Sequence, residues 1–101
     1  MRLIAVKTLR DFWAAHPDAQ SPLRAWADEV RQAQWQQPAD IKARYASASV
    51  LRSRRVVFNV KDNDYRIVVA IAYRLGVGYV KFVGTHAQYD RIDADTVEDS
   101  P

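Results

Sequence analysis

The chain has 101 residues, a mass of 11.6 kDa and 49% hydrophobic residues, a composition typical of one globular domain that excludes intrinsic disorder. The absence of cysteine excludes a disulfide framework, a thiolate metal site and a cysteine nucleophile. The net charge is only +3, but residues 42–81 hold nine basic and two acidic side chains, whereas residues 90–101 hold one basic and five acidic. Such a basic block has two interpretations of equal weight: a face that binds an anionic partner, or a solvated arginine-rich surface.

The N-terminal region does not have the character of a targeting or membrane segment. Residues 1–16 carry four charged side chains and lack the continuous apolar run of a signal peptide. The longest strongly apolar uncharged stretch, residues 67–73, is far shorter than the roughly 20 residues that a membrane-spanning helix needs. We expect a cytoplasmic protein without membrane contact.

The first residues predict a strand followed by a helix. Residues 2–6 are mainly aliphatic and β-branched, which favours a short strand. Thr8 and Asp11 have the spacing of a capping box, so we expect the helix to begin at Thr8. Apolar side chains then recur at helical spacing until Pro17, where the helix ends.

A second helix is predicted to open at Ser21 and Pro22, with a capping hydroxyl and a proline at the first helical position. The two amphipathic helices form a helical hairpin whose apolar faces need a sheet to cover them. Residues 36–54 are less regular and are predicted to be a loop, with a short helix from Pro38 through Tyr45.

From Arg55 onward the hydrophobic period changes from 3.6 to 2, which predicts strands. The predicted elements are a strand, a turn and two further strands at residues 56–60, 61–64, 65–74 and 79–83. Thr85 is expected to cap one last helical turn. The acidic end, residues 93–101, is predicted to be a flexible tail of a single domain spanning residues 1–101.

These elements predict an α+β fold. We expect an N-terminal strand and a helical hairpin to pack on a mainly antiparallel sheet of about four strands, followed by a short C-terminal helical turn. The three glycines match neither a P-loop nor a dinucleotide-binding loop. With two isolated histidines and no cysteine, we expect neither a metal site nor a cofactor.

What remains is a set of basic and aromatic groups near the predicted strand ends: Arg66, Lys81, His86 and Tyr89. Histidine can act as general acid or base near neutral pH, and arginine binds phosphate and stabilises developing charge. This combination suits metal-free cleavage of RNA, in which the ribose 2′-OH attacks the adjacent phosphate. The products are a cyclic phosphate and a free 5′-OH, and DNA is not cut by this route.

The same residues have purely structural interpretations that their spacing leaves open. His86 is equally compatible with a helix cap or a satisfied core histidine. Arg66 fits a solubilising residue at a sheet edge, and Tyr89 fits an ordinary helix contact. His16, at a helix end, is expected to be a surface histidine.

The second half of the chain also carries a longer pattern. It runs F-N-V at 58–60, Asn63, Y-R-I-V at 65–68, and a strand from Tyr79 that ends in T-H-A-Q-Y-D at 85–90. This pattern resembles the HigB-type toxins of the RelE/ParE superfamily, which belong to type II toxin-antitoxin systems, and the likeness extends over nearly the whole chain.

The resemblance implies an mRNA interferase that cleaves translated messages at the ribosome and is neutralised by a helix-turn-helix antitoxin of the HigA type. Carried over by position, His86 is the proton-transfer group, Arg66 and Lys81 hold the scissile phosphate, and Tyr89 positions the substrate. Residues of the hairpin and of the loop before it are predicted to bind RNA: Arg54, Arg55, Asn59, Lys61 and Asn63. The two asparagines have a second interpretation, in which they organise the hairpin.

One departure concerns the proton-transfer pair, because the motif region holds a single histidine. The second partner is then Lys81, Lys61, Tyr89 or a group on the ribosome. Two other functions stay open: a ParE-like toxin that inhibits DNA gyrase without nuclease activity, and a non-catalytic RNA-binding module. In each toxin hypothesis the antitoxin is expected to cover the basic segment or the helical hairpin.

Overall fold

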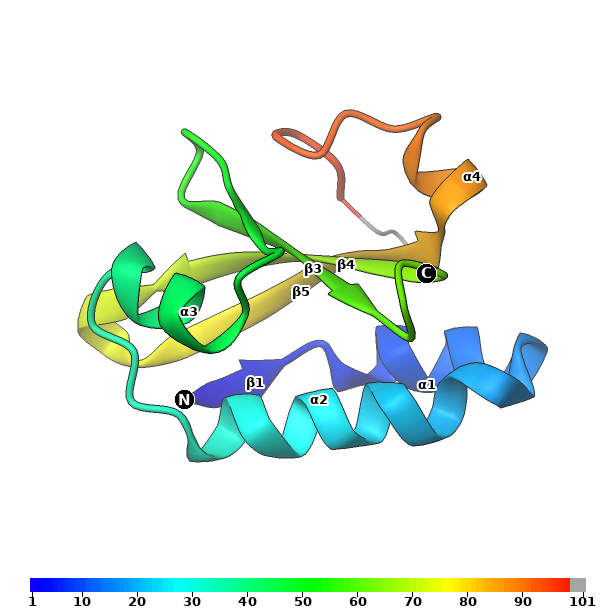
Figure 1. Ribbon diagram of the computed structural model, residues 1–101, viewed down its shortest axis with the longest axis horizontal. Helices are drawn as coiled ribbons and strands as arrows, with labels where there is room; N and C mark the ends of the chain where they lie inside the picture. The colour runs from blue at the N-terminus through cyan, green and yellow to red at the C-terminus, as the bar shows by residue number, and fades with distance from the viewer. Residues whose placement is uncertain (99–101) are drawn as a thin grey trace.

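The computed structural model describes residues 1–98, which form a five-stranded mixed sheet with the two longest helices on one face and the last helix on the other (Figure 1). The strands are β1 (Arg2–Ile4), β2 (Ser49–Val50), β3 (Arg55–Val60), β4 (Tyr65–Ala72) and β5 (Val77–Thr85). The helices are α1 (Val6–Ala15), α2 (Gln20–Gln32), α3 (Pro38–Arg44) and α4 (His86–Tyr89), with short 3-10 turns at Pro17–Ala19 and Tyr73–Leu75. The predicted α+β class is confirmed.

The sheet has the order β1-β5-β4-β3-β2, with β1 parallel to β5 and every other pair antiparallel. It contains one strand more than expected, because β2 lies within the segment predicted to be a loop. Ser49 and Val50 pair with Val57 and Val56 on the outer edge of the sheet. Two residues are too few to show an alternating pattern, so the sequence carries no signal for this strand.

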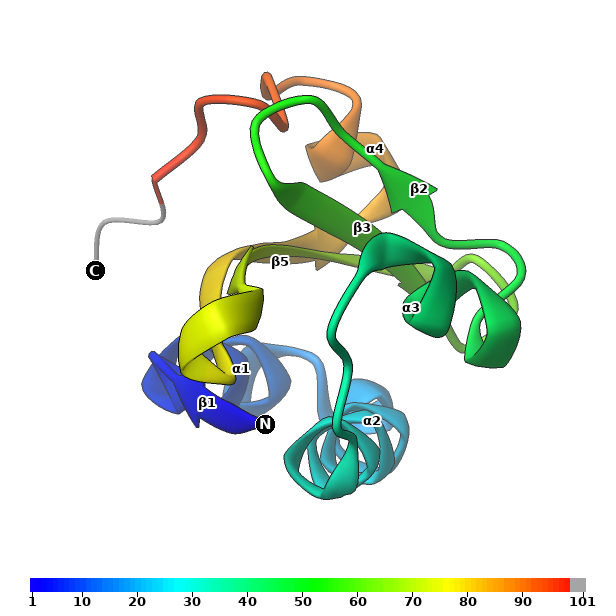
Figure 2. The ribbon, with the colours of Figure 1, turned by 90° about the vertical axis from the view of Figure 1, so that its left-hand side faces the viewer.

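The hydrophobic core lies between the sheet and the pair α1 and α2, which run along one face of it (Figures 1 and 2). Phe58 of β3 is fully buried at the centre. The Trp26 ring of α2 meets it edge-on with centroids 5.3 Å apart, and the Trp35 ring stacks on it at 5.9 Å. The Tyr45 ring, at the end of α3, closes the cluster at 5.2 Å.

The predicted starts of the first two helices differ from the structure. Helix α1 begins at Val6 after Ala5, whose φ of 67° places it in the left-handed region, and no side chain caps it. Asp11 pairs instead with Lys7, at 2.7 Å, so the predicted capping box is wrong. Helix α2 begins at Gln20, because the 3-10 turn at Pro17–Ala19 leads directly into it and fixes the start one residue before Ser21.

The β3–β4 hairpin has the predicted turn at residues 61–64, and in β4 the residues alternate between core and opposite face as expected. Strand β5 departs from alternation at a bulge. Val69 pairs with Val80 and Val68 with Phe82, which leaves Lys81 as the extra residue. As a result Val80 and Val83 both face the core, which corrects the prediction that Val83 shares a face with Lys81.

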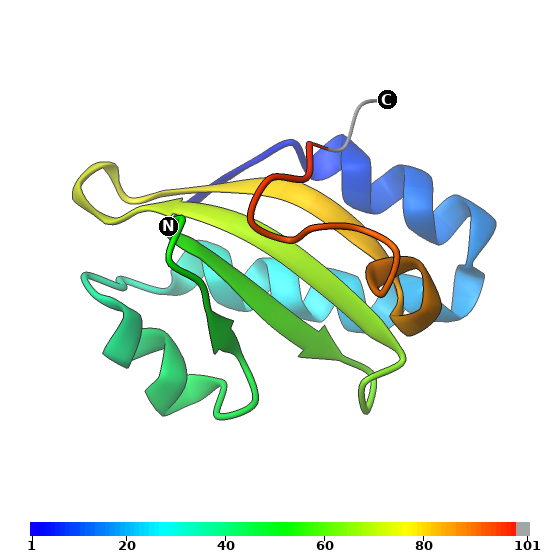
Figure 3. The same ribbon diagram turned by 90° about the horizontal axis from the view of Figure 1, so that it is seen from above.

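The face of the sheet away from α1 and α2, called here the open face, is where α4 and the residues after it lie (Figures 1 and 3). Arg55 donates hydrogen bonds to the backbone oxygens of Ala94 and Val97, so residues 94–97 lie against this face. The predicted flexibility of residues 93–101 stays a prediction, and residues 99–101 lie outside the described residues. Among residues 1–98, no helix combines the length and apolarity needed to cross a membrane.

Candidate active site

Helix α4 starts where β5 ends, and the predicted cap at Thr85 is confirmed. The Gln88 backbone N–H donates to Thr85 Oγ1 at 3.2 Å, and the Thr85 backbone N–H donates to Gln88 Oε1 at 2.8 Å. This capping box satisfies two backbone donors that the helix start would leave unpaired. The His86 backbone N–H also donates to the carbonyl oxygen of Asp64, at 3.2 Å. The first turn of α4 is therefore fixed both to β5 and to the β3–β4 turn.

Three of the four predicted catalytic side chains meet at this strand end. Arg66 pairs with Gly84 in the β4–β5 ladder, so its side chain emerges beside α4. Its Nη2 lies 3.3 Å from His86 Nε2, and its guanidinium carbon lies 5.0 Å from the centre of the Tyr89 ring. A guanidinium nitrogen can only donate, so in this contact His86 Nε2 is unprotonated and accepts with its lone pair. That is the state of a general base.

Asp90 adds a carboxylate to the group, with its Oδ1 3.6 Å from His86 Nε2. Once the imidazole takes up a proton, this carboxylate is placed to stabilise the resulting charge. The side chains of His86 and Asp90 are 56% and 64% exposed, so a large substrate can reach them. The role of Asp90 beside His86 was not predicted, although their i,i+4 spacing on a helical turn is a signal for it.

Asn59 lies directly opposite Arg66 in the β3–β4 ladder. Its Nδ2 donates to the Ser47 carbonyl oxygen at 3.0 Å, which holds the loop before β2 against β3. Within the described part of the chain, Arg66 Nε and Asn59 Oδ1 are buried polar atoms without a hydrogen-bond partner. Asn63 takes a left-handed conformation in the turn, with φ of 73°, as its second interpretation expects.

The structure places the fourth predicted catalytic residue, Lys81, in a different part of the open face. Its Nζ pairs with Glu98 Oε2 at 3.0 Å, and Glu98 Oε1 pairs with Arg55 Nη2 at the same distance. Arg55 lies opposite Ala70, four residues along β4 from Arg66, which is about 13 Å at roughly 3.3 Å per residue. The candidate residues thus form two groups rather than one.

The remaining basic candidates have local roles. Lys61 Nζ pairs with Asp18 Oδ2 at 2.6 Å, and Tyr65 donates its hydroxyl to the same oxygen at 2.7 Å. The hydrogen bond from Lys61 lowers the pKa of Asp18, and Asp18 raises the pKa of Lys61. A lysine held in its charged form cannot accept a proton near neutral pH, so Lys61 does not fit a general base. Arg54 is a turn residue with φ of 63°.

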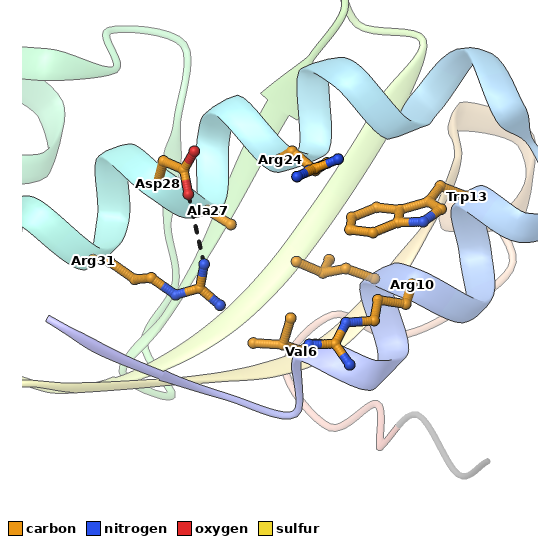
Figure 4. Close-up of a pocket in the computed structure, with 8 residues that line it drawn as sticks. Val6, Arg10, Trp13, Arg24, Ala27, Asp28 and Arg31 are labelled. Carbon is orange, nitrogen blue, oxygen red and sulfur yellow. Dashed lines mark ion pairs between the residues drawn. The ribbon is translucent and has the colours of Figure 1, made fainter.

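A groove of about 200 Å³ lies on the other side of the molecule, between α1 and α2 (Figure 4). Trp13 forms part of its wall, and three arginines border it: Arg10, Arg24 and Arg31. Asp28 neutralises one of them, through a 3.6 Å ion pair with Arg31. In the part of the chain that the structure covers, no group of three His, Cys, Asp or Glu side chains is arranged to hold a metal ion.

A family model for HigB toxins, described as the RelE-like toxic component of a toxin-antitoxin system, matches residues 19–92. The chain belongs to the HigB toxin family. The matched region runs from α2 to just beyond α4, and so contains Arg66, His86 and Tyr89. The resemblance drawn from the sequence is confirmed, and an antitoxin is the partner of a toxin of this family.

Two relatives that the chain resembles are also HigB proteins. The mRNA interferase toxin HigB of Escherichia coli (strain K12) is 28% identical over 92 residues, which cover 89% of this chain and 88% of that protein. The mRNA interferase HigB of Shigella flexneri has the same identity and coverage. The similarity of these HigB proteins therefore spans nearly the full length of both chains.

Proposed function

We propose that this HigB toxin is an mRNA interferase, an endoribonuclease that inhibits translation by cutting messenger RNA. The observation that carries the proposal is the contact between Arg66 Nη2 and His86 Nε2, which joins a phosphate-binding group to a proton acceptor at an exposed strand end. The family match and the names of the relatives support the same activity. An exposed site suits a long polymer, whereas a small metabolite is usually enclosed in a cavity.

The proposed reaction follows from what each side chain can do. His86 Nε2 takes the proton of a ribose 2′-OH, the oxygen forms a new bond to phosphorus, and the bond from phosphorus to the 5′-oxygen breaks. Arg66 donates to the phosphate and stabilises its developing charge. Tyr89 positions the substrate beside them. The products are a 2′,3′-cyclic phosphate and a 5′-OH, and the leaving oxygen takes up one proton.

We propose Tyr89 or a group on the ribosome as the donor of that second proton. Lys61 is held by Asp18 on the helix side of the hairpin turn, and Lys81 pairs with Glu98. Neither ammonium has a contact with His86 or Arg66 among the hydrogen bonds and ion pairs of residues 1–98. We therefore expect Lys81 to act on RNA binding rather than on the chemical step.

The test is expression of the toxin and of His86→Ala and Arg66→Ala variants, with message ends mapped by primer extension. Each variant is expected to lose cleavage by at least about 100-fold, the effect of removing a general base or a charge-stabilising donor. The matched controls are His16→Ala and Arg74→Ala, which remove the same residue types away from the site.

Unchanged cleavage in both site variants removes these residues from the mechanism. Growth arrest with intact messages and accumulated DNA breaks identifies a gyrase inhibitor instead. Salt-sensitive RNA binding without any product identifies a binding module.

We further propose the partners and the setting of this activity: translated mRNA on the ribosome, in the cytoplasm, and a HigA-like helix-turn-helix antitoxin. The antitoxin is expected to contact the basic open face or the helical hairpin, where Arg10 and Arg24 border the groove of Figure 4. Co-expression with the antitoxin should yield one tight complex on purification. A toxin that elutes alone at about micromolar concentration contradicts this expectation.

A further inference from the structure

The C-terminal segment holds a carboxylate against two cations of the open face, away from the proposed reaction centre. Glu98 places one oxygen 3.0 Å from Arg55 Nη2 and the other 3.0 Å from Lys81 Nζ. The Glu98 side chain is 60% exposed, whereas the Arg55 side chain is only 9% exposed. Removing the carboxylate therefore leaves a preformed pair of cations.

Arg55 is held rigidly in this position. It lies at the first pair of the β3–β4 ladder, opposite Ala70, and its Nη1 donates to the carbonyl oxygens of Val97 and Ala94, at 2.7 and 3.2 Å. Lys81 comes from the bulge of β5, and its ammonium lies 5.8 Å from the centre of the Tyr79 ring. Side chains from two strands, β3 and β5, thus converge on one anion.

The chemistry of the two cations fits a phosphodiester. A carboxylate has two oxygens that share one negative charge, and the non-bridging oxygens of a phosphodiester have the same pattern. A guanidinium donor and an ammonium donor, one on each oxygen, are the contacts that such a group accepts. Hydrogen bonding to Lys81 and Arg55 lowers the pKa of Glu98, so the carboxylate is charged at neutral pH.

The open face between the two groups of candidate residues is apolar. Val57 and Val68 pair there and are almost fully buried, although they point away from the core beneath α1 and α2. Residues 93–98 run across this face (Figure 3), and Phe82, which pairs with Val68, is half-buried. Aromatic side chains beside cationic groups are typical of single-strand nucleic acid binding.

We propose that Arg55 and Lys81 form a second phosphate subsite for the RNA, which the Glu98 carboxylate fills in the free toxin. The proposal rests on the proposed function, because it takes RNA as the ligand of the open face. An RNA strand with its scissile phosphate at Arg66 can carry a phosphate further along the strand to Lys81 and to Arg55, which lies about 13 Å along the sheet. The acidic segment and the RNA then compete for the same two cations.

The test measures binding of a single-stranded RNA oligonucleotide whose riboses carry 2′-O-methyl groups, so that cleavage cannot occur. Glu98→Gln keeps the size of the side chain and removes its charge. It is expected to bind about tenfold more tightly, as one additional charge-assisted contact would give. The slope of log affinity against log salt should steepen by about 0.7, which corresponds to one more neutralised phosphate.

The matched control is Asp95→Asn, which removes the same charge from the same segment. Asp95 accepts from Ser53 Oγ at 2.8 Å rather than pairing with Arg55 or Lys81, and the asparagine oxygen can still accept. Its affinity is expected to change by less than about twofold, because an exposed charge at a distance is screened by salt. Adding Lys81→Gln to Glu98→Gln should abolish the gain. Thermal unfolding of each variant checks that the fold is retained.

Equal gains in affinity in Glu98→Gln and Asp95→Asn overturn the subsite, because the effect then comes from the overall charge of the segment. No gain in either variant overturns it too. Absence of binding in every variant at low salt overturns it as well. A gain confined to Glu98→Gln in a protein that never cleaves unmodified RNA keeps the subsite and refutes the nuclease function instead. The two proposals therefore fail separately.

Discussion

Gly84 lies between the sheet and the helix cap of the candidate active site, and an added methyl group there tests how the two are joined. It pairs with Arg66 and immediately precedes Thr85. A Cβ at this position would lie 2.5 Å from Phe82 Cζ and 2.9 Å from Gln88 Oε1. Since Gln88 Oε1 is the atom that accepts from the Thr85 backbone N–H, Gly84→Ala must displace half of the capping box.

The expected cost combines three effects. Overpacking against Phe82 costs about 1–3 kcal/mol and loss of a cap about 1 kcal/mol, while replacing glycine stabilises by about 0.4–1 kcal/mol through the unfolded chain. The net destabilisation is about 2 kcal/mol, or a fall in Tm of about 10 °C for a domain of this size. Gln88→Ala alone loses the cap without a clash and should cost about 1 kcal/mol.

Urea unfolding of the two single variants and the double variant separates these effects. In the double variant the alanine no longer meets the Gln88 side chain, so the combined cost should fall short of the sum by about 0.5–1 kcal/mol. RNA cleavage should fall in Gly84→Ala, because α4 carries His86 and Tyr89. A Gly84→Ala protein as stable as the wild type, or strictly additive costs, would refute the reasoning.

Two further predictions concern the core and the hairpin turn. Phe58→Ala should lower the free energy of unfolding by about 3–5 kcal/mol, because Phe58 is fully buried among the rings of Trp26, Trp35 and Tyr45. Val50→Ala, at the exposed edge of the sheet, should change it by less than about 0.5 kcal/mol, and urea titrations of the two variants compare these effects. The pKa of Asp18 is lowered chiefly by its hydrogen bond from Lys61, so its contribution to stability is present above the ordinary carboxyl pKa and is lost as pH falls through the lowered one. Asp18→Asn should therefore flatten the acid limb of stability against pH, and an unchanged limb would show that the pair contributes nothing.

The elements that the sequence predicts correctly are those with local signals. The β3–β4 hairpin follows from alternating residues and a polar four-residue turn, and the cap at Thr85 follows from its hydroxyl at the start of the last helical turn. The capping-box spacing of Thr8 and Asp11 fails, because the chain leaves β1 through a left-handed Ala5 and enters α1 two residues earlier. That start is imposed by the pairing of β1 with β5, a contact that no local pattern contains.

The same distinction between local signals and long-range contacts applies to the candidate active site. Arg66, His86 and Tyr89 meet because adjacent strands and a capped helical turn place them together, and both features have sequence signals. Lys81 is separated from them by the bulge in β5 and by its ion pair with Glu98. Bulges and long-range ion pairs depend on tertiary packing. The sequence therefore shows a basic and an acidic segment, but not that Glu98 of the acidic segment pairs with Arg55 and Lys81 of the basic one.

The most direct test of the central claim, that His86 and Arg66 cleave RNA through the 2′-OH, is the chemistry of the product ends. Purified toxin with ribosomes on a defined message should leave a 2′,3′-cyclic phosphate on one fragment and a 5′-OH on the other. A single 2′-deoxynucleotide at the cleaved position should abolish that cut, and His86→Ala should give no fragments. Cleavage of the deoxy-substituted message, or fragments that carry a 5′-phosphate, would contradict the account.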